Sequence, residues 1–180
     1  MSVETYLIYL GVLAVFFATP PDTSQLLIIS NSLRRGLRRS MATIAGDLSA
    51  NYLQMALAGF GLTAVIAASA GALSVIKWLG VAYLVWIGLQ LLLSRPKSDA
   101  PEAGSEGRLF RQGFLTSTAN PYAVVFFGAL FPQFIDPALP VWPQLLILGA
   151  TYLAVDGAIL MLWGWAAART VGRVQTLNDI

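Results

Sequence analysis

The feature that most constrains this sequence is its long apolar runs, each bounded by charged or turn-forming residues. A span across ~30 Å of hydrocarbon needs roughly 20 predominantly apolar residues. Five segments fit, at about residues 6–33, 41–68, 73–93, 113–134 and 143–168. Of the 180 residues, 57% are hydrophobic and only 11% are charged, whereas soluble domains contain about 25% charged residues. The sequence therefore predicts an all-α fold, a polytopic transmembrane helical bundle with five spans in a single domain.

Composition also excludes several classes of chemistry. The chain has no cysteine, which removes disulfides and thiolate metal sites, and no histidine, which removes the usual proton shuttle and metal ligand. We therefore expect no metal and no cofactor. So few charged residues leave no room for a separate soluble domain or a nucleic-acid interface, and the expected surrounding is a lipid bilayer.

Ten of the eleven basic residues are predicted to lie on one side of the membrane. They are Arg34, Arg35, Arg38 and Arg39 after the first span, Arg95, Lys97, Arg108 and Arg111 after the third, and Arg169 and Arg173 in the tail. Only Lys77 falls on the other side. Because loops rich in Lys and Arg face the cytoplasm, the N-terminus is predicted to be outside.

Two of the predicted spans are interrupted at matching places, by Pro20-Pro21 in the first and by Asn120-Pro121 in the fourth. Proline lacks a backbone N–H and clashes with the preceding turn, so all three prolines predict helix breaks. Broken helices in corresponding positions of two halves indicate the binding site of a transporter. The alternative is that the prolines only shape helix packing.

The matching breaks divide the chain into two halves. The first half, residues 1–94, holds three spans, and an odd number of spans inverts the second half relative to the first. Residues 95–112 are expected to form a cytoplasmic linker, because the stretch 94–107 is rich in Pro, Gly, Ser and charge. The second half, residues 113–180, is then incomplete, with two spans.

Three acidic residues, Asp22, Asp47 and Asp156, fall inside predicted spans with no Lys or Arg nearby in sequence. A charge at the bilayer centre costs at least about 2.5–3.5 kcal/mol, so such residues usually face a cavity and have a function. Burial disfavours the charged carboxylate, which makes protonation near neutral pH feasible. For Asp22 the structural alternative is an N-cap of the helix that follows the first break.

Polar residues in the second span recur at a helical spacing. The spacing places them on one face, and the set is Ser40, Thr43, Asp47, Asn51 and Gln54. Ala58 and Gly61 continue this stripe with small side chains that would allow close helix approach. A seam of hydrogen bonds between helices is the structural alternative, above all for Asn51 and Gln54. In the fifth span, Tyr152 lies one turn before Asp156, so its phenol can reach that carboxyl.

These groups suit a small zwitterion. An embedded Asp can pair with an ammonium group, and the N-terminus of a half-helix after a proline break can bind a carboxylate. The same carboxyl groups can carry a proton, so substrate and proton can compete for one site, as antiport requires. The expected substrate- and proton-binding residues are Asp22, Asp47, Asn51, Asn120 and Asp156.

The sequence resembles the LysE/RhtB family of amino-acid exporters, in its homoserine/threonine exporter-like branch. The motifs that carry the resemblance are Leu26-Leu27-Ile28-Ile29-Ser30, Ser32-Leu33-Arg34-Arg35-Gly36, an Ala45-Gly46 turn, Ile76-Lys77-Trp78-Leu79-Gly80-Val81-Ala82-Tyr83-Leu84, Phe114-Leu115-Thr116, Asn120-Pro121 and Phe131-Pro132-Gln133-Phe134. The resemblance covers nearly the whole chain. It implies proton-driven export of amino acids or similar metabolites from a bacterial inner membrane.

The chain departs from the family pattern at two points. Where the family usually has Pro-Gly-Pro, this chain has Pro21-Asp22-Thr23, which keeps the break and changes the groups around it. The family has six spans, arranged as 3+3 inverted repeats, and this chain stops about where the sixth should begin. The resemblance therefore implies that a partner chain, such as a second copy in a homodimer, seals the pathway.

Three other functions compete with amino-acid export. An intramembrane aspartyl protease also uses paired acids, but its Tyr-Asp and Gly-x-Gly-Asp motifs are absent, so no enzyme activity is expected. A cation transporter could use the embedded carboxylates, although the polar stripe is mostly neutral. A non-transporting, truncated membrane module is the third alternative.

Overall fold

The computed structural model describes residues 1–18, 20–67, 105–120, 122–123, 126–136 and 138–178. These residues are helical and contain no strand. The elements are α1 (Val3–Phe17), α2 (Thr23–Arg35), α3 (Leu37–Ala67), α5 (Glu106–Thr118), the π-helix η1 (Phe126–Leu130), the 3-10 helix η2 (Phe131–Phe134) and α7 (Val141–Asn178). The predicted third span, Lys77 and most of the predicted linker lie outside the described residues.

The first predicted span is two helices. α1 ends at Phe17, and α2 begins after Asp22, whose carboxyl caps it by accepting a hydrogen bond from the Gln25 N–H at 2.9 Å. Gly36 alone separates α2 from α3, and its φ of 77° is a left-handed conformation that favours glycine. The predicted fourth span is also interrupted: α5 ends at Thr118, and it begins at Glu106, inside the predicted linker.

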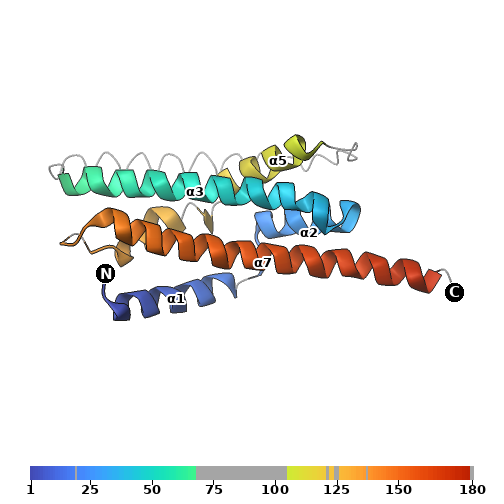
Figure 1. The fold of residues 1–180 in the computed structure, drawn as a ribbon, viewed down its shortest axis with the longest axis horizontal. Helices are drawn as coiled ribbons and strands as arrows, with labels where there is room; N and C mark the ends of the chain where they lie inside the picture. Colours follow the sequence, from blue (N-terminus) through green and yellow to red (C-terminus); the bar gives the residue numbers. More distant parts are fainter. Residues whose placement is uncertain (19, 68–104, 121, 124–125, 137, 179–180) are drawn as a thin grey trace.

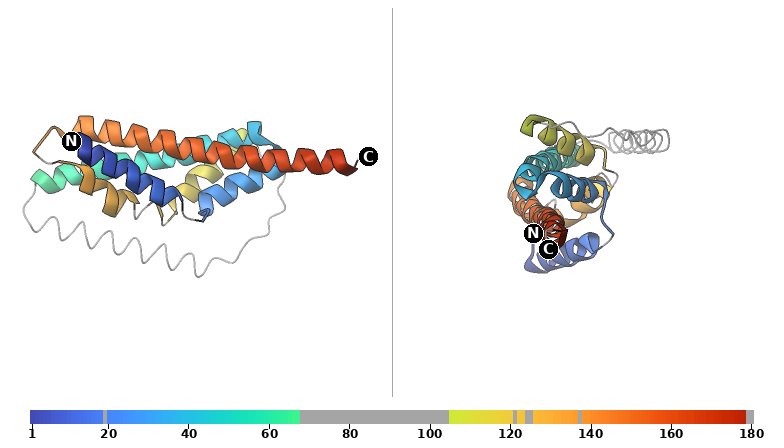
Figure 2. Two further views of the ribbon diagram at one scale, coloured as in Figure 1. Left: turned by 90° about the horizontal axis from the view of Figure 1, so that it is seen from below. Right: turned by 90° about the vertical axis from the view of Figure 1, so that its right-hand side faces the viewer.

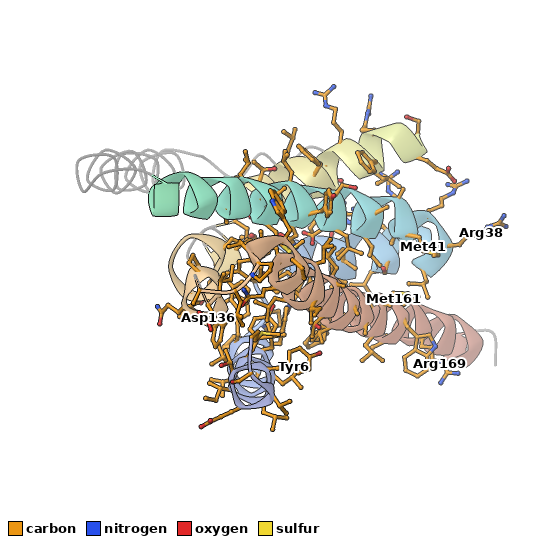
Figure 3. All side chains as sticks on the ribbon, turned by 60° about the vertical axis from the view of Figure 1, so that its left-hand side comes forward. Tyr6, Arg38, Met41, Asp136, Met161 and Arg169 are labelled. Carbon is orange, nitrogen blue, oxygen red and sulfur yellow. The ribbon has the colours of Figure 1, made fainter. Side chains whose placement is uncertain are left out.

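α3 lies at the centre of the bundle and packs against α2, α5 and α7 (Figure 1). α1 lies along α7 at one edge, which the end-on view in Figure 2 shows clearly. The end of α2, the starts of α3 and α5 and the end of α7 gather at one end of the bundle, opposite the N-terminus. In Figure 3, Arg38 projects from this end and Asp136 from the other. The described arginines are therefore grouped at one end, as the sequence predicts.

Two glycines set the crossing of α3 and α5. A Cβ on Gly46 would collide with the backbone carbonyl of Phe110, and a Cβ on Gly113 would collide with that of Thr43. Gly46 therefore lies inside α3 at a close helix contact, and the expected turn at this position is wrong. Gly61, the other position predicted to allow close approach, has no described neighbour within 4 Å of its Cβ position.

We expect Gly46→Ala to lower the free energy of unfolding by about 1–3 kcal/mol, because the new methyl group must push α5 away. Gly61→Ala is the matched control on the same helix, since its Cβ would meet no described atom within 4 Å. That variant should be neutral or slightly stabilising because Ala is the better helix former. Thermal unfolding in detergent measures both, and equal melting temperatures for the two variants would contradict this account of the crossing.

The described part of the chain has an apolar exterior and polar groups inside. Large apolar side chains that are more than half exposed occur on α1, α2, α3, α5 and α7, and they include Leu7, Leu26, Leu57, Leu115 and Leu162. Met41 and Met161 lie on the same outer surface (Figure 3). Such a surface is unusual for a soluble monomer and suits hydrocarbon.

Among the described residues, one helical segment, Val141–Thr170, is by itself long and apolar enough to cross a membrane. α1 is apolar but has only 15 residues. The first predicted span is divided between α1 and α2, and α3 carries arginines at its start and Asp47 further along. The described residues therefore contain one clear apolar span, and the count of five remains a prediction.

An aromatic cluster fills the space beside the breaks. Tyr9 of α1 packs against Phe131 and Phe134 of η2, and its hydroxyl donates to the Leu148 carbonyl at 2.9 Å. Tyr152 of α7 contacts this cluster with ring centroids 4.9 Å from those of Phe126. The Phe-Pro-Gln-Phe motif thus packs on α1, and Phe126 of η1 connects the same cluster to α7.

Candidate binding site

The two helix breaks meet. Asp22, from the first break, accepts a hydrogen bond at Oδ2 from the Asn120 side-chain amide at 2.7 Å, although the residues are 98 positions apart. Asn120 also accepts the Tyr122 backbone N–H at 3.0 Å, so it caps the second break. Asp22 is therefore both the N-cap of α2 and one side of a link between the breaks. Pro20 and Pro21 lie within the first break, whereas Pro121 lies outside the described residues.

The other two embedded acids also come together. The side-chain amide of Asn51 donates to Asp47 Oδ2 at 3.1 Å and to Asp156 Oδ2 at 2.8 Å. Asp47 and Asn51 lie one turn apart on α3, and Asp156 lies on α7, so this contact depends on the packing of α3 against α7. We call Asp47 and Asp156 the carboxyl pair, and Asn51 its bridging amide.

The end of α5 connects the second break to this pair. The Ser117 hydroxyl donates to Asn51 Oδ1 at 3.0 Å. The Gln54 amide donates to the carbonyls of Ser117 at 3.2 Å and Thr118 at 3.4 Å, at the point where α5 ends. Ser117 is not among the residues that the sequence predicts for the site, because its contact with Asn51 depends on the packing of α5 against α3.

The carboxyl pair is deeply buried. Asp47 is 2% exposed and Asp156 is 5% exposed. Among the described residues, both carboxyl groups accept a hydrogen bond from the Asn51 amide, and no ion pair with a described cation is formed. Within the described part of the chain, Asp47 Oδ1 and the Ser24 hydroxyl have no hydrogen-bond partner, and the same is true of Gln54 Oε1. Buried polar atoms without partners are uncommon in proteins and call for a functional explanation.

A second polar layer separates the carboxyl pair from the arginine-rich end. The Asn31 amide of α2 donates to the Thr43 hydroxyl of α3 at 3.0 Å and to Gln112 Oε1 of α5 at 3.3 Å. Ser40 donates to the Gly36 carbonyl at 3.1 Å. The predicted stripe on α3 is thus turned inward. Thr43 and Gln54 form hydrogen bonds to other helices, Ser40 bonds within its own segment, and the centre of the stripe holds Asp47 and Asn51.

The arrangement can bind a cationic group or a proton. Asp47 keeps one unpaired oxygen, and Asn51 can bond either carboxyl. No group of three or more acidic side chains among the described residues is placed to hold a metal ion. Tyr152 is buried against Phe127, and no hydrogen bond from its phenol to Asp156 occurs among those formed by the described residues. The chemistry of the site is therefore that of amide-bridged carboxyl groups.

Comparison with known proteins agrees with this description. The sequence model of the family described as LysE type translocator matches residues 15–177. An uncharacterized membrane protein of Vibrio cholerae is 40% identical over 176 residues, covering 96% of this chain and 85% of that protein. Proteins of Salmonella typhimurium and Salmonella typhi, each named homoserine/homoserine lactone efflux protein, are 33% identical over 97% of this chain and 86% of their own length. No solved structure shows a significant match.

Proposed function

This chain belongs to the family of LysE type translocators, and from that premise we propose that it exports amino acids or related small metabolites in exchange for protons. The names of the Salmonella relatives support an amino-acid-like substrate. Family and relatives both point to a transporter rather than an enzyme. The proposed location is a bacterial inner membrane, with the arginine-rich end in the cytoplasm and the N-terminus outside.

One observation carries the exchange mechanism: two buried carboxyl groups share a single amide beside a pair of linked helix breaks. A buried carboxylate without a cation is unfavourable, so each must gain either a proton or a cationic ligand. Asn51 donates hydrogen bonds to both Asp47 and Asp156, so protonation or ligand binding at one carboxyl group affects the other. A substrate ammonium and a proton would then compete for the same charge.

The helix breaks would let the site open. Asp22 and Asn120 hold the two breaks together by one hydrogen bond, and Gln54 holds the end of α5. Exchange of these contacts for contacts with substrate would free short helices to move against the long helices α3 and α7. Assembly of the chain as a homodimer belongs to the same proposal.

A flux screen in proteoliposomes tests the proposed function. With an imposed proton gradient, we expect movement of a radiolabelled amino acid such as L-homoserine and no movement in protein-free liposomes. Radioactive sodium and calcium should not move, and their movement without amino-acid movement would support the cation-transporter alternative. Movement of neither would support a non-transporting module and contradict the proposal.

A further inference from the structure

We propose that Ser24, the first backbone N–H groups of α2 and the free oxygen of Asp47 form one subsite for the carboxylate and ammonium groups of an α-amino acid. This inference rests on the proposed function and assigns the substrate's two charged groups to particular atoms. It predicts that the protein distinguishes a free amino acid from its lactone, which has no carboxylate.

The start of α2 provides the donors for a carboxylate. α2 has 13 residues, and its first hydrogen bonds run from the Gln25 N–H to the Asp22 side chain and from the Leu26 N–H to the Asp22 carbonyl. The N–H groups of Thr23 and Ser24 precede both bonds, so they have no acceptor within the helix. Free N–H groups and the positive end of the helix dipole favour an anion at this position.

Ser24 is the independent observation that points to a ligand. Ser24 is 5% exposed, and its hydroxyl has no hydrogen-bond partner among the residues that the structure describes. It lies near the Asp47 carboxyl, but the geometry of a hydrogen bond between the two is not met, and Asp47 Oδ1 is likewise buried and without a partner among the described residues. A donor and an acceptor that are both buried, adjacent and unsatisfied would gain the most from a ligand that carries both complementary groups.

Asp22 does not compete for this ligand. Both of its carboxyl oxygens already accept hydrogen bonds, one from the Gln25 N–H and one from the Asn120 amide. Asp22 thus sets the start of α2 and leaves the unpaired Ser24 hydroxyl, near Asp47, as the side-chain donor for the ligand. The ammonium and carboxylate of an α-amino acid are attached to the same carbon, which suits a donor and an acceptor that lie side by side.

The experiment measures the KM of L-homoserine and of L-homoserine lactone for Ser24→Ala in proteoliposomes. Loss of a hydrogen bond to a charged group should raise the KM of homoserine about tenfold or more. The KM of the lactone should change less than twofold. Ser24→Thr, which keeps the hydroxyl, should recover most of the homoserine affinity. Ser49→Ala is the control, because Ser49 is exposed and bonds only to the Ala45 carbonyl of its own helix.

Ligand-induced thermal stabilisation in detergent separates failure of this inference from failure of the proposed function. Equal KM changes for both substrates, or no change for either, overturn the subsite alone. If wild type transports neither compound, export is overturned. In that case the subsite is supported if homoserine raises the melting temperature of wild type more than that of Ser24→Ala. If homoserine raises both melting temperatures equally, or raises neither, the subsite is overturned together with export.

Discussion

Replacing Asp47 or Asp156 with Asn is expected to reduce proton-driven export of amino acid by about 30-fold or more. The substitution keeps the size of the side chain but removes the only charge that can bind an ammonium or carry a proton at that position. Loss of one partner of a buried charge pair, here the carboxylate that faces the substrate ammonium, costs about 2–5 kcal/mol. The lower value corresponds to about 30-fold in affinity. Initial rates of labelled-substrate flux under a fixed proton gradient measure the effect.

Glu4→Gln is the control for these two variants, because Glu4 is exposed in the first turn of α1. It should transport at the wild-type rate. Exchange of labelled for unlabelled amino acid, with no gradient, separates the two roles of each acid. A variant that loses only its proton-carrying role should keep this exchange, whereas one that loses the ammonium partner should not. Wild-type flux in both Asp variants would remove them from the mechanism.

Replacing Asn51 with Leu is expected to lower the free energy of unfolding by about 3–5 kcal/mol and to abolish transport. Leu has a similar size, but it leaves Asp47 and Asp156 buried without their shared donor. The Ser117 hydroxyl loses its acceptor as well. Chemical unfolding in detergent measures the stability, and flux measures the transport.

Tyr52→Leu is the matched control for Asn51→Leu. Tyr52 is the next residue on α3 and is 59% exposed, so its replacement should change stability little. If Asn51→Leu is as stable as Tyr52→Leu, the amide does not hold the carboxyl pair together. The hydrogen-bond seam would then be dispensable, and the account of the site would have to change.

The sequence predicts the polar interior well because the constraint is local. The helical spacing from Ser40 to Gln54 determines which side chains share a face, and proline chemistry determines where the helices end. The structure accordingly turns that face inward and interrupts the helix at both expected places. The family assignment from sequence motifs is confirmed by the match over residues 15–177.

Contacts between distant segments could not be predicted in the same way. The link from Asp22 to Asn120 depends on how α2 and α5 are placed around α3, which no local pattern specifies. The same holds for Gly46 and Gly113, whose small size matters only because two backbones cross there. Ser24 and Ser117 are ordinary helix-end residues by sequence. Their importance follows from their position beside the carboxyl pair.

The most direct test of the central claim is whether water-soluble molecules reach the carboxyl pair. Because the chain has no cysteine, a single Ser117→Cys variant can be labelled selectively with a small hydrophilic thiol reagent. Ala123→Cys, buried at 3% exposure in the aromatic cluster, is the control. We predict that Ser117→Cys reacts in membranes, that a transported amino acid slows the reaction, and that Ala123→Cys stays unreactive. Ser117→Cys that is as unreactive as Ala123→Cys under every gradient, or that reacts without protection by substrate, would contradict a transport pathway at this site.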